Sequence, residues 1–404
     1  MINYDGFFQN CISSIKIENR YRVFQDIDRY FNSFPRAYRN INNSKQEITI
    51  WCSLDYLGMA THPVITGAIK NSLDKFGAGS GGSRNIAGNH NQHLLVEREL
   101  ANLHKKEAGL LFTSGYNANQ ASIMALGKIM PNCVFLSDED NHASIISGIK
   151  HSGCQKIVFK HNDYKDLKRH LEKLPLMQPK VIIFESLYSM SGSIAPIKQF
   201  IKLAKQYNAM TYVDEVHAVG IYGQSGGGIT EQLGIASEID IIQGTLGKAF
   251  GVVGGYITGN KNIVDAIRST AGGFIFTVSL PPAFCDGICE SIQYIKSHPQ
   301  EGQLLFKNAN TLRHRLQSIG INIMGSNNYI IPIFIGDAEL CTQIGSHLLD
   351  YYGIYTQAIN YPSVRKGQER LRVTITAKHT EDDITKFVDA IDETMQKFLA
   401  KKCA

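Results

Sequence analysis

Val181-Ile182-Ile183-Phe184 and Met210-Thr211-Tyr212-Val213 are two short apolar runs, separated by the helical pattern of Ile197 to Tyr207. Apolar runs of this length are typical of strands that are buried on both faces. Strands that alternate with helices favour a mainly parallel sheet covered by helices on both sides. This stretch therefore predicts the α/β fold class.

The same alternation continues over residues 48–298, which we predict to form one large domain. The further strand-like runs in it are Gly109–Phe112, Cys133–Leu136, Ile239–Ile242 and Gly254–Ile257. Helical patterns lie between most of these runs, so the large domain is expected to hold one mainly parallel sheet.

The order of elements differs on either side of this domain. Residues 1–47 have a helical and polar pattern, which predicts an arm that lies over another domain or subunit. Residues 299–404 predict a smaller α+β domain, with helices at Glu301–Ile319, Ala338–Tyr352 and Glu381–Ala400 and strands at Ile330–Phe334 and Leu371–Ile375.

The composition limits the classes of protein to consider. With 404 residues, 43% hydrophobic and 19% charged, the chain is typical of a soluble globular protein. The net charge of +5 comes without a long basic run, so no nucleic-acid partner is expected. No stretch approaches the roughly 18 apolar residues of a membrane span.

The eight cysteines form no CxxC pair and show no metal-ligand spacing, so we predict no metal site and a reducing compartment. The amino terminus lacks the basic and apolar segments of a signal peptide. A cytoplasmic protein with no membrane partner is expected.

The glycine-rich run Gly77–Asn85 contains the GxGxxG spacing of a dinucleotide-binding loop. That motif needs a strand before it and a helix that opens within it. Here the helical segment Pro63–Phe76 precedes the run, which argues against an NAD oxidoreductase. A loop whose backbone approaches a ligand closely is favoured, and a flexible loop is the alternative.

A phosphate site is predicted within Phe112–Asn119, which leads from a strand into a helix. Free backbone N–H groups and the positive end of the helix dipole bind anions at such a place. Ser114 and Gly115 would let a phosphate come close. An ordinary helix N-cap is the alternative.

Asp214 and Lys248 both follow buried strands, where a charge is costly. A carboxylate at Asp214 needs a cation, and a pyridinium nitrogen that it keeps protonated is one. His217 could reach the phenolic oxygen of the same ring. Lys248 stands among small residues, where loss of water favours the neutral amine that Schiff-base chemistry needs. With Thr245 as a further phosphate contact, these residues predict pyridoxal 5′-phosphate (PLP) on Lys248, while a turn-capping Asp and a solvated Lys are the alternatives.

With these residues placed, the chain resembles the α-oxoamine synthases, the fold-type I PLP enzymes that condense an amino acid with an acyl-CoA and release carbon dioxide. It is most similar to the branch that joins glycine to succinyl-CoA. The resemblance extends from Arg20 to Thr380 and rests on Leu136–Asp138 with Asn141–Ser144, Asp214–Gly220, Gly273–Thr277 and Tyr352–Tyr355.

The resemblance implies a fold-type I homodimer in which three residues are catalytic. Lys248 would hold PLP and remove the Cα proton of glycine, His142 would stack on the ring, and Asp214 would hold its nitrogen. Cofactor binding is implied for Ser114, Gly115, Tyr116, His142, Ser189, Asp214, His217, Thr245, Lys248 and Thr277. Thr277 would reach in from the partner subunit, so the active sites would be shared.

Substrate binding is implied for Arg22, Ser83, Asn85, Ile86, Ser137, Lys156, Ser363 and Arg372. Arg372 matches the Arg that clamps the amino-acid carboxylate, and its planar fork suits bidentate pairing. Arg22 would meet the second carboxylate of the succinyl group.

The implied reaction is the condensation of glycine with succinyl-CoA to 5-aminolevulinate, CoA and carbon dioxide, the first step of tetrapyrrole and haem synthesis. The chain departs from the family pattern at Leu54, Ser83, Ser191 and Val278, where Asn, Thr, Asp and Thr are usual. A sister synthase that uses another acyl-CoA or amino acid is therefore the enzymatic alternative. A catalytically silent PLP-fold partner subunit is the non-enzymatic one, and the retained Lys248 argues against it.

Overall fold

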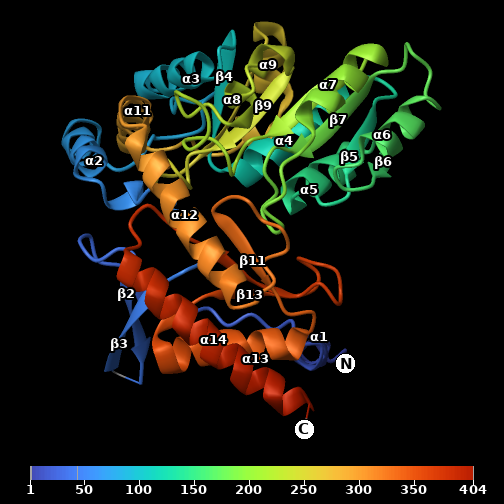
Figure 1. Cartoon of the computed structure of the whole chain (residues 1–404). Coiled ribbons are helices and arrows are strands. Elements are labelled where there is room, and N and C mark those ends of the chain that lie inside the picture. Colours follow the sequence, from blue (N-terminus) through green and yellow to red (C-terminus); the bar gives the residue numbers. More distant parts are fainter. Residues whose placement is uncertain (1, 43, 404) are drawn as a thin grey trace. The chain divides into compact units, whose positions relative to one another are not determined.

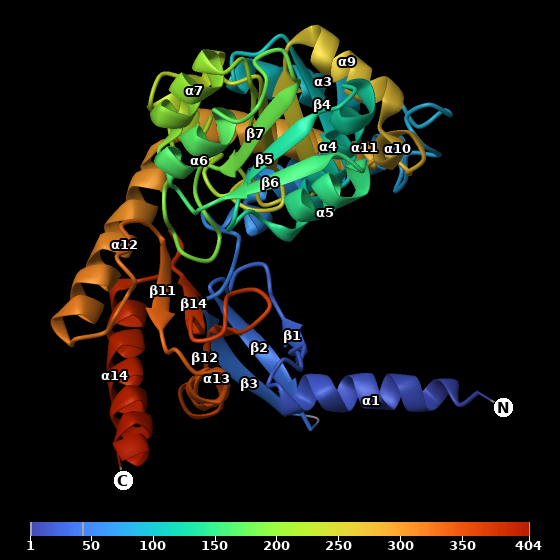
Figure 2. The same ribbon diagram turned by 90° about the vertical axis from the view of Figure 1, so that its right-hand side faces the viewer.

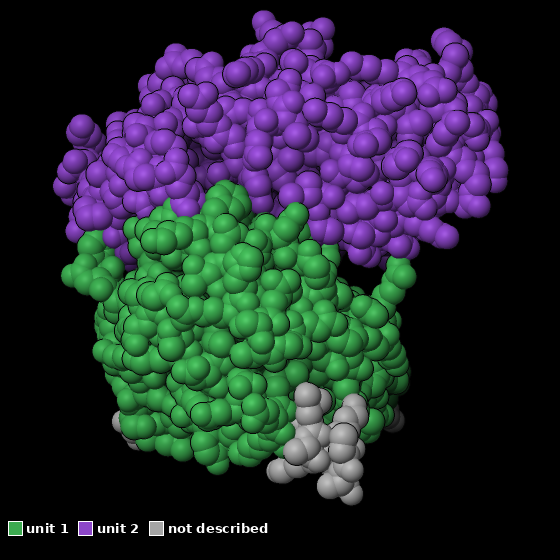
Figure 3. Space-filling view, in the orientation of Figure 1, with its two compact units in different colours: residues 1–56, 190–192, 304–404 green, residues 57–189, 193–303 purple. Residues whose placement is uncertain are grey.

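The computed structural model describes residues 2–42 and 44–403, with side chains described as far as residue 398. The chain divides into two compact units, which are described separately (Figure 3). Unit 1 comprises residues 1–56, 190–192 and 304–404, and unit 2 comprises residues 57–189 and 193–303.

Unit 2 contains a seven-stranded sheet with the order β4-β10-β9-β8-β7-β5-β6. Neighbours from β9 through β6 are parallel, and β10 is antiparallel to both β4 and β9. The predicted mainly parallel sheet is thus confirmed, and Figure 2 shows β5, β6 and β7 side by side. The strands are β4 (Ala108–Phe112), β5 (Val134–Asp138), β6 (Gln155–Phe159), β7 (Lys180–Glu185), β8 (Met210–Asp214), β9 (Ile241–Thr245) and β10 (Gly255–Gly259).

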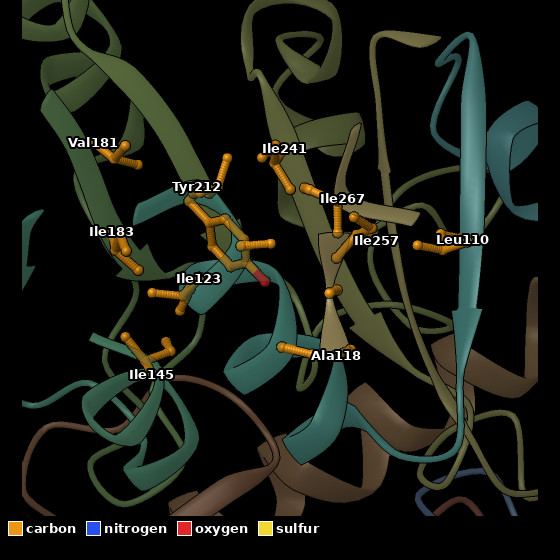
Figure 4. Packing of buried hydrophobic residues seen from close by; sticks show 14 of the residues in the cluster. Leu110, Ala118, Ile123, Ile145, Val181, Ile183, Tyr212, Ile241, Ile257 and Ile267 are labelled. Carbon is orange, nitrogen blue, oxygen red and sulfur yellow. The ribbon is translucent and has the colours of Figure 1, made fainter. Parts of the chain in front are cut away.

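Apolar side chains cover both faces of this sheet. On one face Ile183 belongs to the core that Figure 4 shows, together with Ile123 of α4 and Ile145 of α5. Successive residues of a strand point to opposite faces, so the next residue, Phe184, lies on the other face. There its ring packs against that of Phe200 in α7, with 4.8 Å between the ring centroids. This two-sided burial is why the strands read as continuous apolar runs.

The helices of unit 2 are α2 (Pro63–Phe76), α3 (Asn91–Leu103), α4 (Gly115–Ile129), α5 (Ala143–Ser152), α6 (Tyr164–Leu171), α7 (Ile197–Gln206), α8 (Ile229–Gln232), α9 (Lys261–Thr270), α10 (Gly272–Ile275) and α11 (Pro282–Ser297) (Figure 1). The helix predicted before the glycine-rich run is confirmed as α2, with Gly77 as its C-cap at φ 75°. The run therefore follows a helix and does not have the context of a dinucleotide-binding motif.

Unit 1 holds two small sheets. One has the order β1-β2-β3-β12 and the other β11-β14-β13. Their strands are β1 (Ile27–Asp28), β2 (Arg36–Ile41), β3 (Ser44–Ile50), β11 (Ile330–Phe334), β12 (Ile354–Tyr355), β13 (Gln357–Ile359) and β14 (Arg370–Thr374). The remaining helices are α1 (Tyr4–Ile17), α12 (Gln300–Ser318), α13 (Ala338–Tyr352) and α14 (Glu381–Cys403). Within the described chain, no helix combines the length and the apolar character that crossing a membrane requires.

The helical pattern predicted for residues 1–47 is wrong beyond α1. Residues 36–41 and 44–50 form the antiparallel pair β2–β3 instead, and β12 extends that sheet in parallel. The reason is burial: Ala37, Ile48 and Ile50 share a small core with Leu349 of α13, a partner about 300 positions away. The division into domains at residues 47/48 and 298/299 stays a prediction.

Candidate active site

The parallel strands of unit 2 bring the predicted cofactor residues to one edge of the sheet. The strands β5, β7, β8 and β9 run in the same direction, so their carboxyl ends lie on one side. His142 follows β5, Ser189 follows β7, Asp214 ends β8 and Lys248 follows β9. Ligands of open α/β sheets bind at this edge.

Lys248 and His217 contact each other at this edge. Lys248 Nζ lies 2.7 Å from His217 Nε2, and His217 is 5% exposed. The two residues come from the segments after β9 and after β8, so the contact depends on the order of strands in the sheet. An amine this close to a buried imidazole can exchange a proton with it.

Asp214 is buried, with 4% of its surface exposed. Its carboxylate accepts hydrogen bonds from Asn119 Nδ2 at 2.8 Å and from the Val216 N–H at 2.9 Å. Burial raises the pKa of Asp214, and these two donors lower it only in part. A cation in front of the carboxylate would offset the remaining cost of burying its charge.

His142 caps the amino terminus of α5. Its Nδ1 lies 2.7 Å from Ser144 Oγ and accepts the Ser144 N–H at 3.2 Å. Asn119 Nδ2 donates to the same Ser144 hydroxyl at 3.0 Å. Because Asn119 also donates to Asp214, it links the contacts of His142 with those of Asp214. His142 as a whole is exposed, although burial lowers the pKa of its imidazole. A flat ligand could stack on this ring.

The predicted phosphate turn lies where three segments meet. Ser114 caps α4, and its Oγ accepts the Asn117 N–H at 3.1 Å. A Cβ on Gly115 would lie 3.2 Å from the side chain of Thr245. A Cβ on Gly255 would lie 2.4 Å from the Gly115 nitrogen. Glycine at position 255 therefore lets β10 approach the start of α4 closely. Ser114 takes the Asn117 N–H, and the earlier N–H groups of this helix terminus are where an anion could bind.

These residues fit PLP. A buried carboxylate that lacks a full counter-charge suits a pyridinium nitrogen, and an exposed imidazole ring suits the face of the pyridine. The glycine-built turn at the start of α4 suits the phosphate, and Lys248 offers an amine for the aldehyde. The predicted residues Ser114, Gly115, His142, Asp214, His217, Thr245 and Lys248 lie in these contacts. Tyr116, 46% exposed, has its ring edge toward His142, at 6.3 Å between centroids.

The predicted substrate residues of unit 2 are more scattered. Ser137 is buried at the end of β5, and its Oγ accepts from Asn141 Nδ2 at 2.9 Å. Ser83 pairs with Val278, next to Thr277, while Asn85 and Ile86 are exposed in the glycine-rich loop. Lys156 is exposed on the edge strand β6.

Unit 1 holds the other predicted substrate residues. Arg22 Nη2 lies 3.5 Å from Ser363 Oγ, although 341 positions separate them, and both are exposed. Arg372 is 6% exposed on β14. The hydroxyl of Tyr56 is buried, which raises its pKa, and a hydrogen bond with Arg372 lowers it in part.

Two residues next to Asp214, Glu185 and Asn119, were not predicted from the sequence. Glu185 ends β7 directly opposite Asp214 of β8, and it is 2% exposed. Burial, followed by the charge of Asp214, raises the pKa of Glu185 well above its ordinary value. It follows the run Val181–Phe184 just as Asp214 follows Met210–Val213, and this repeated pattern could have identified it. Asn119, inside a helix, had no such signal.

Comparison with known proteins agrees with this geometry. The family model for aminotransferases of class I and II matches residues 46–391. The chain is 49% identical to 5-aminolevulinate synthase from Rhizobium meliloti (strain 1021) over 390 residues, 96% of each chain. It is 48% identical to 5-aminolevulinate synthase from Bradyrhizobium diazoefficiens over 390 residues, 96% of this chain and 95% of that one. A solved structure of SPT with PLP has a TM-score of 0.91 at 28% identity and covers 98% of both chains.

The fold is that of the fold-type I PLP-dependent transferases, with a mainly parallel seven-stranded sheet that agrees with this similarity. The chain belongs to the class I and II aminotransferase family, and within that family to the α-oxoamine synthases.

Proposed function

We propose that the protein binds PLP at Lys248 and condenses glycine with succinyl-CoA to give 5-aminolevulinate, CoA and carbon dioxide. The observation that carries the proposal is the contact between Lys248 Nζ and His217 Nε2, at 2.7 Å, beside the buried Asp214. The similarity over 96% of the chain to two proteins named 5-aminolevulinate synthase supports the choice of substrates.

The cofactor, when bound, supplies an electron-withdrawing ring that stabilises negative charge at the substrate carbon. In this proposal Lys248 Nζ takes the proton from the Cα atom of glycine, and His217 Nε2 orients that amine. Asp214 would pair with the positive charge of the ring nitrogen, and Asn119 holds the Asp214 carboxylate by a hydrogen bond. His142 would lie against the ring, and the cofactor site would be completed by Ser114, Gly115, Tyr116, Thr245, Ser189 and the partner's Thr277.

Substrate recognition is assigned to basic and polar side chains. Arg372 would pair with the carboxylate of glycine, because its guanidinium is a bidentate donor. Arg22 with Ser363 would take the terminal carboxylate of the succinyl group. Ser83, Asn85, Ile86, Ser137 and Lys156 would surround the acyl-CoA. A sister synthase with another acyl chain is the second candidate, favoured by Leu54, Ser83, Ser191 and Val278.

A CoA-release assay with a panel of acyl-CoAs and amino acids tests the proposal. We expect succinyl-CoA with glycine to have the highest kcat/KM. Arg22→Leu should narrow the preference for succinyl-CoA over octanoyl-CoA, since it removes the cation for the second carboxylate. A higher kcat/KM for octanoyl-CoA in the unmodified protein would instead establish the sister-synthase function. Borohydride reduction should fix PLP on the peptide that contains Lys248, and a label on any other lysine would contradict the assignment.

The assembly and location are part of the same proposal. Phe276 and Val278 are 86% and 64% exposed on either side of Thr277, and such apolar surface supports burial against a second copy of the chain. We assign the protein to the cytoplasm as a homodimer with shared active sites.

A further inference from the structure

The carboxylate of Asp138, a residue outside the proposed PLP contacts, accepts hydrogen bonds from three donors. Its side chain is fully buried at the end of β5. It accepts the backbone N–H of Asp140 at 2.9 Å and that of Asn162 at 2.8 Å. The third donor is His161 Nδ1, at 2.9 Å. Asp138 therefore holds the start of the loop that leads to His142.

The second nitrogen of His161 contacts a different segment as well as the neighbouring Asn162, whose Nδ2 lies 3.2 Å from it. Its Nε2 lies 2.7 Å from Ser193 Oγ, and its ring stands edge-on to Tyr188, with 4.3 Å between centroids and 89° between planes. Burial lowers the pKa of His161, and the carboxylate of Asp138, with Asp140 and Glu139, more than offsets this, so the pKa is raised. The charge partners of His161 thus all come from the β5 side.

Ser193 belongs to a hairpin that also carries Ser189. Leu187 and Ile194 pair as an antiparallel bridge, and the Tyr188 N–H donates to the Ser193 carbonyl at 3.0 Å. The Ala195 N–H closes the base of the hairpin on the Ser186 carbonyl at 3.0 Å. A shift of Ser193 would therefore move the backbone of both hairpin strands together.

We propose that His161 is a positioning residue, which links Asp138 to Ser193 and so holds the Leu187–Ile194 hairpin at a set distance from the loop that carries His142. The inference rests on the proposed function, because that function assigns both His142 and Ser189 to PLP. The order carboxylate, imidazole, hydroxyl is also that of a hydrolytic triad. Here it joins two segments of the PLP site, and the chain of contacts ends on the hairpin backbone.

The test is the dissociation constant of PLP for variants of the full chain, measured by the absorbance of the bound cofactor. Ser193→Ala removes only the hydroxyl end of the link. His161→Asn keeps an amide nitrogen at the place of Nδ1, beside Asp138, and loses the end that reaches Ser193. Each variant should raise the dissociation constant about three- to tenfold, the effect of one lost hydrogen bond. The double variant should raise it no further, because both changes break the same link.

Two controls sharpen the result. Ser193→Thr keeps the hydroxyl and should retain the affinity of the unmodified protein. Ser147→Ala breaks a matched Ser–His contact of 3.3 Å with His151 on α5, and it should leave PLP affinity unchanged.

Three outcomes would overturn the inference. The first is a lower Tm of Ser193→Ala and His161→Asn with unchanged PLP affinity, since the link would then only stabilise the fold. The second is additive effects in the double variant. The third is labelling of Ser193 by a fluorophosphonate, because Ser193 would then be a nucleophile of its own. Failure of the proposed function would look different, as the unmodified protein would not hold PLP on Lys248.

Discussion

At the scale of single residues, the proposed cofactor site depends most on the charge of Asp214. We expect Asp214→Asn to weaken PLP binding and turnover about 100-fold or more, since a buried ion pair that loses one partner costs about 3–5 kcal/mol. PLP titration and CoA release measure the two effects. Asn119→Ala removes one of the two hydrogen-bond donors to this carboxylate. This variant should weaken PLP binding about tenfold. Near-normal turnover in Asp214→Asn would show that the carboxylate only caps the turn at Val216.

At the scale of elements, β10 approaches the start of α4 closely, at the turn to which we assign the phosphate. Gly255→Ala would place a methyl group 2.4 Å from the Gly115 nitrogen and the Ser114 carbonyl. The turn would have to shift, so we expect PLP affinity to fall at least tenfold while the far-UV circular dichroism stays unchanged. The matched control is Gly67→Ala in α2, where an added Cβ meets nothing within 4 Å. It should leave PLP affinity intact and keep or raise stability, because Ala is the better helix former.

The packing of α14 in unit 1 makes stability depend on pH. His379 is 3% exposed, and its ring lies 4.1 Å from that of Trp51, which in turn lies 4.3 Å from the ring of Phe387 in α14. Burial lowers the pKa of His379 to about 4. The unfolded chain binds a proton here near pH 6.5 but the folded chain does not, so stability is lost as the pH falls from about 6.5 to 4, by up to roughly 3 kcal/mol.

Urea unfolding at a series of pH values measures how the free energy of unfolding depends on pH. The fluorescence of Trp51, the one tryptophan of the chain, reports the unfolding. His379→Gln should flatten the dependence between pH 6.5 and 4, whatever it does to stability at neutral pH. His151→Gln, a change at an exposed histidine of α5, serves as the control and should leave the slope as it is. An equally steep loss of stability in His379→Gln would assign the acid sensitivity to other groups, with the buried His104 the first of them, since burial lowers its pKa to about 3.

At the level of the whole molecule, we propose a dimer in which each active site contains residues of both chains. Lys248→Ala and a Thr277 variant such as Thr277→Val should each have low activity alone. A mixture refolded together should recover part of the activity, because one site of the mixed dimer would have both intact residues. Light scattering should give twice the mass of the 44.9 kDa chain. A monomer by this measurement, or no recovery in the mixture, would contradict shared sites.

Local sequence patterns are enough to predict the large sheet, most of its helices and the residues at its edge to which we assign the cofactor. Apolar runs such as Val181–Phe184 identify strands because burial on both faces is a property of one segment. Helix α13 was predicted with its observed bounds, Ala338–Tyr352, since capping residues are local. Lys248 and Asp214 could be recognised because a charge directly after a buried strand is unusual wherever it occurs.

Which distant segments meet cannot be predicted from such local patterns and becomes visible in the folded chain. The pairing of β2 with β3 against Leu349, the contact of Arg22 with Ser363, and the Asp138–His161–Ser193 link each join parts of the chain whose spacing carries no signal. The same holds for Glu185 beside Asp214, which requires β7 and β8 to be neighbours in register. Periodicity along a segment reports whether that segment is buried, whereas its partner is set by the order in which strands and helices pack.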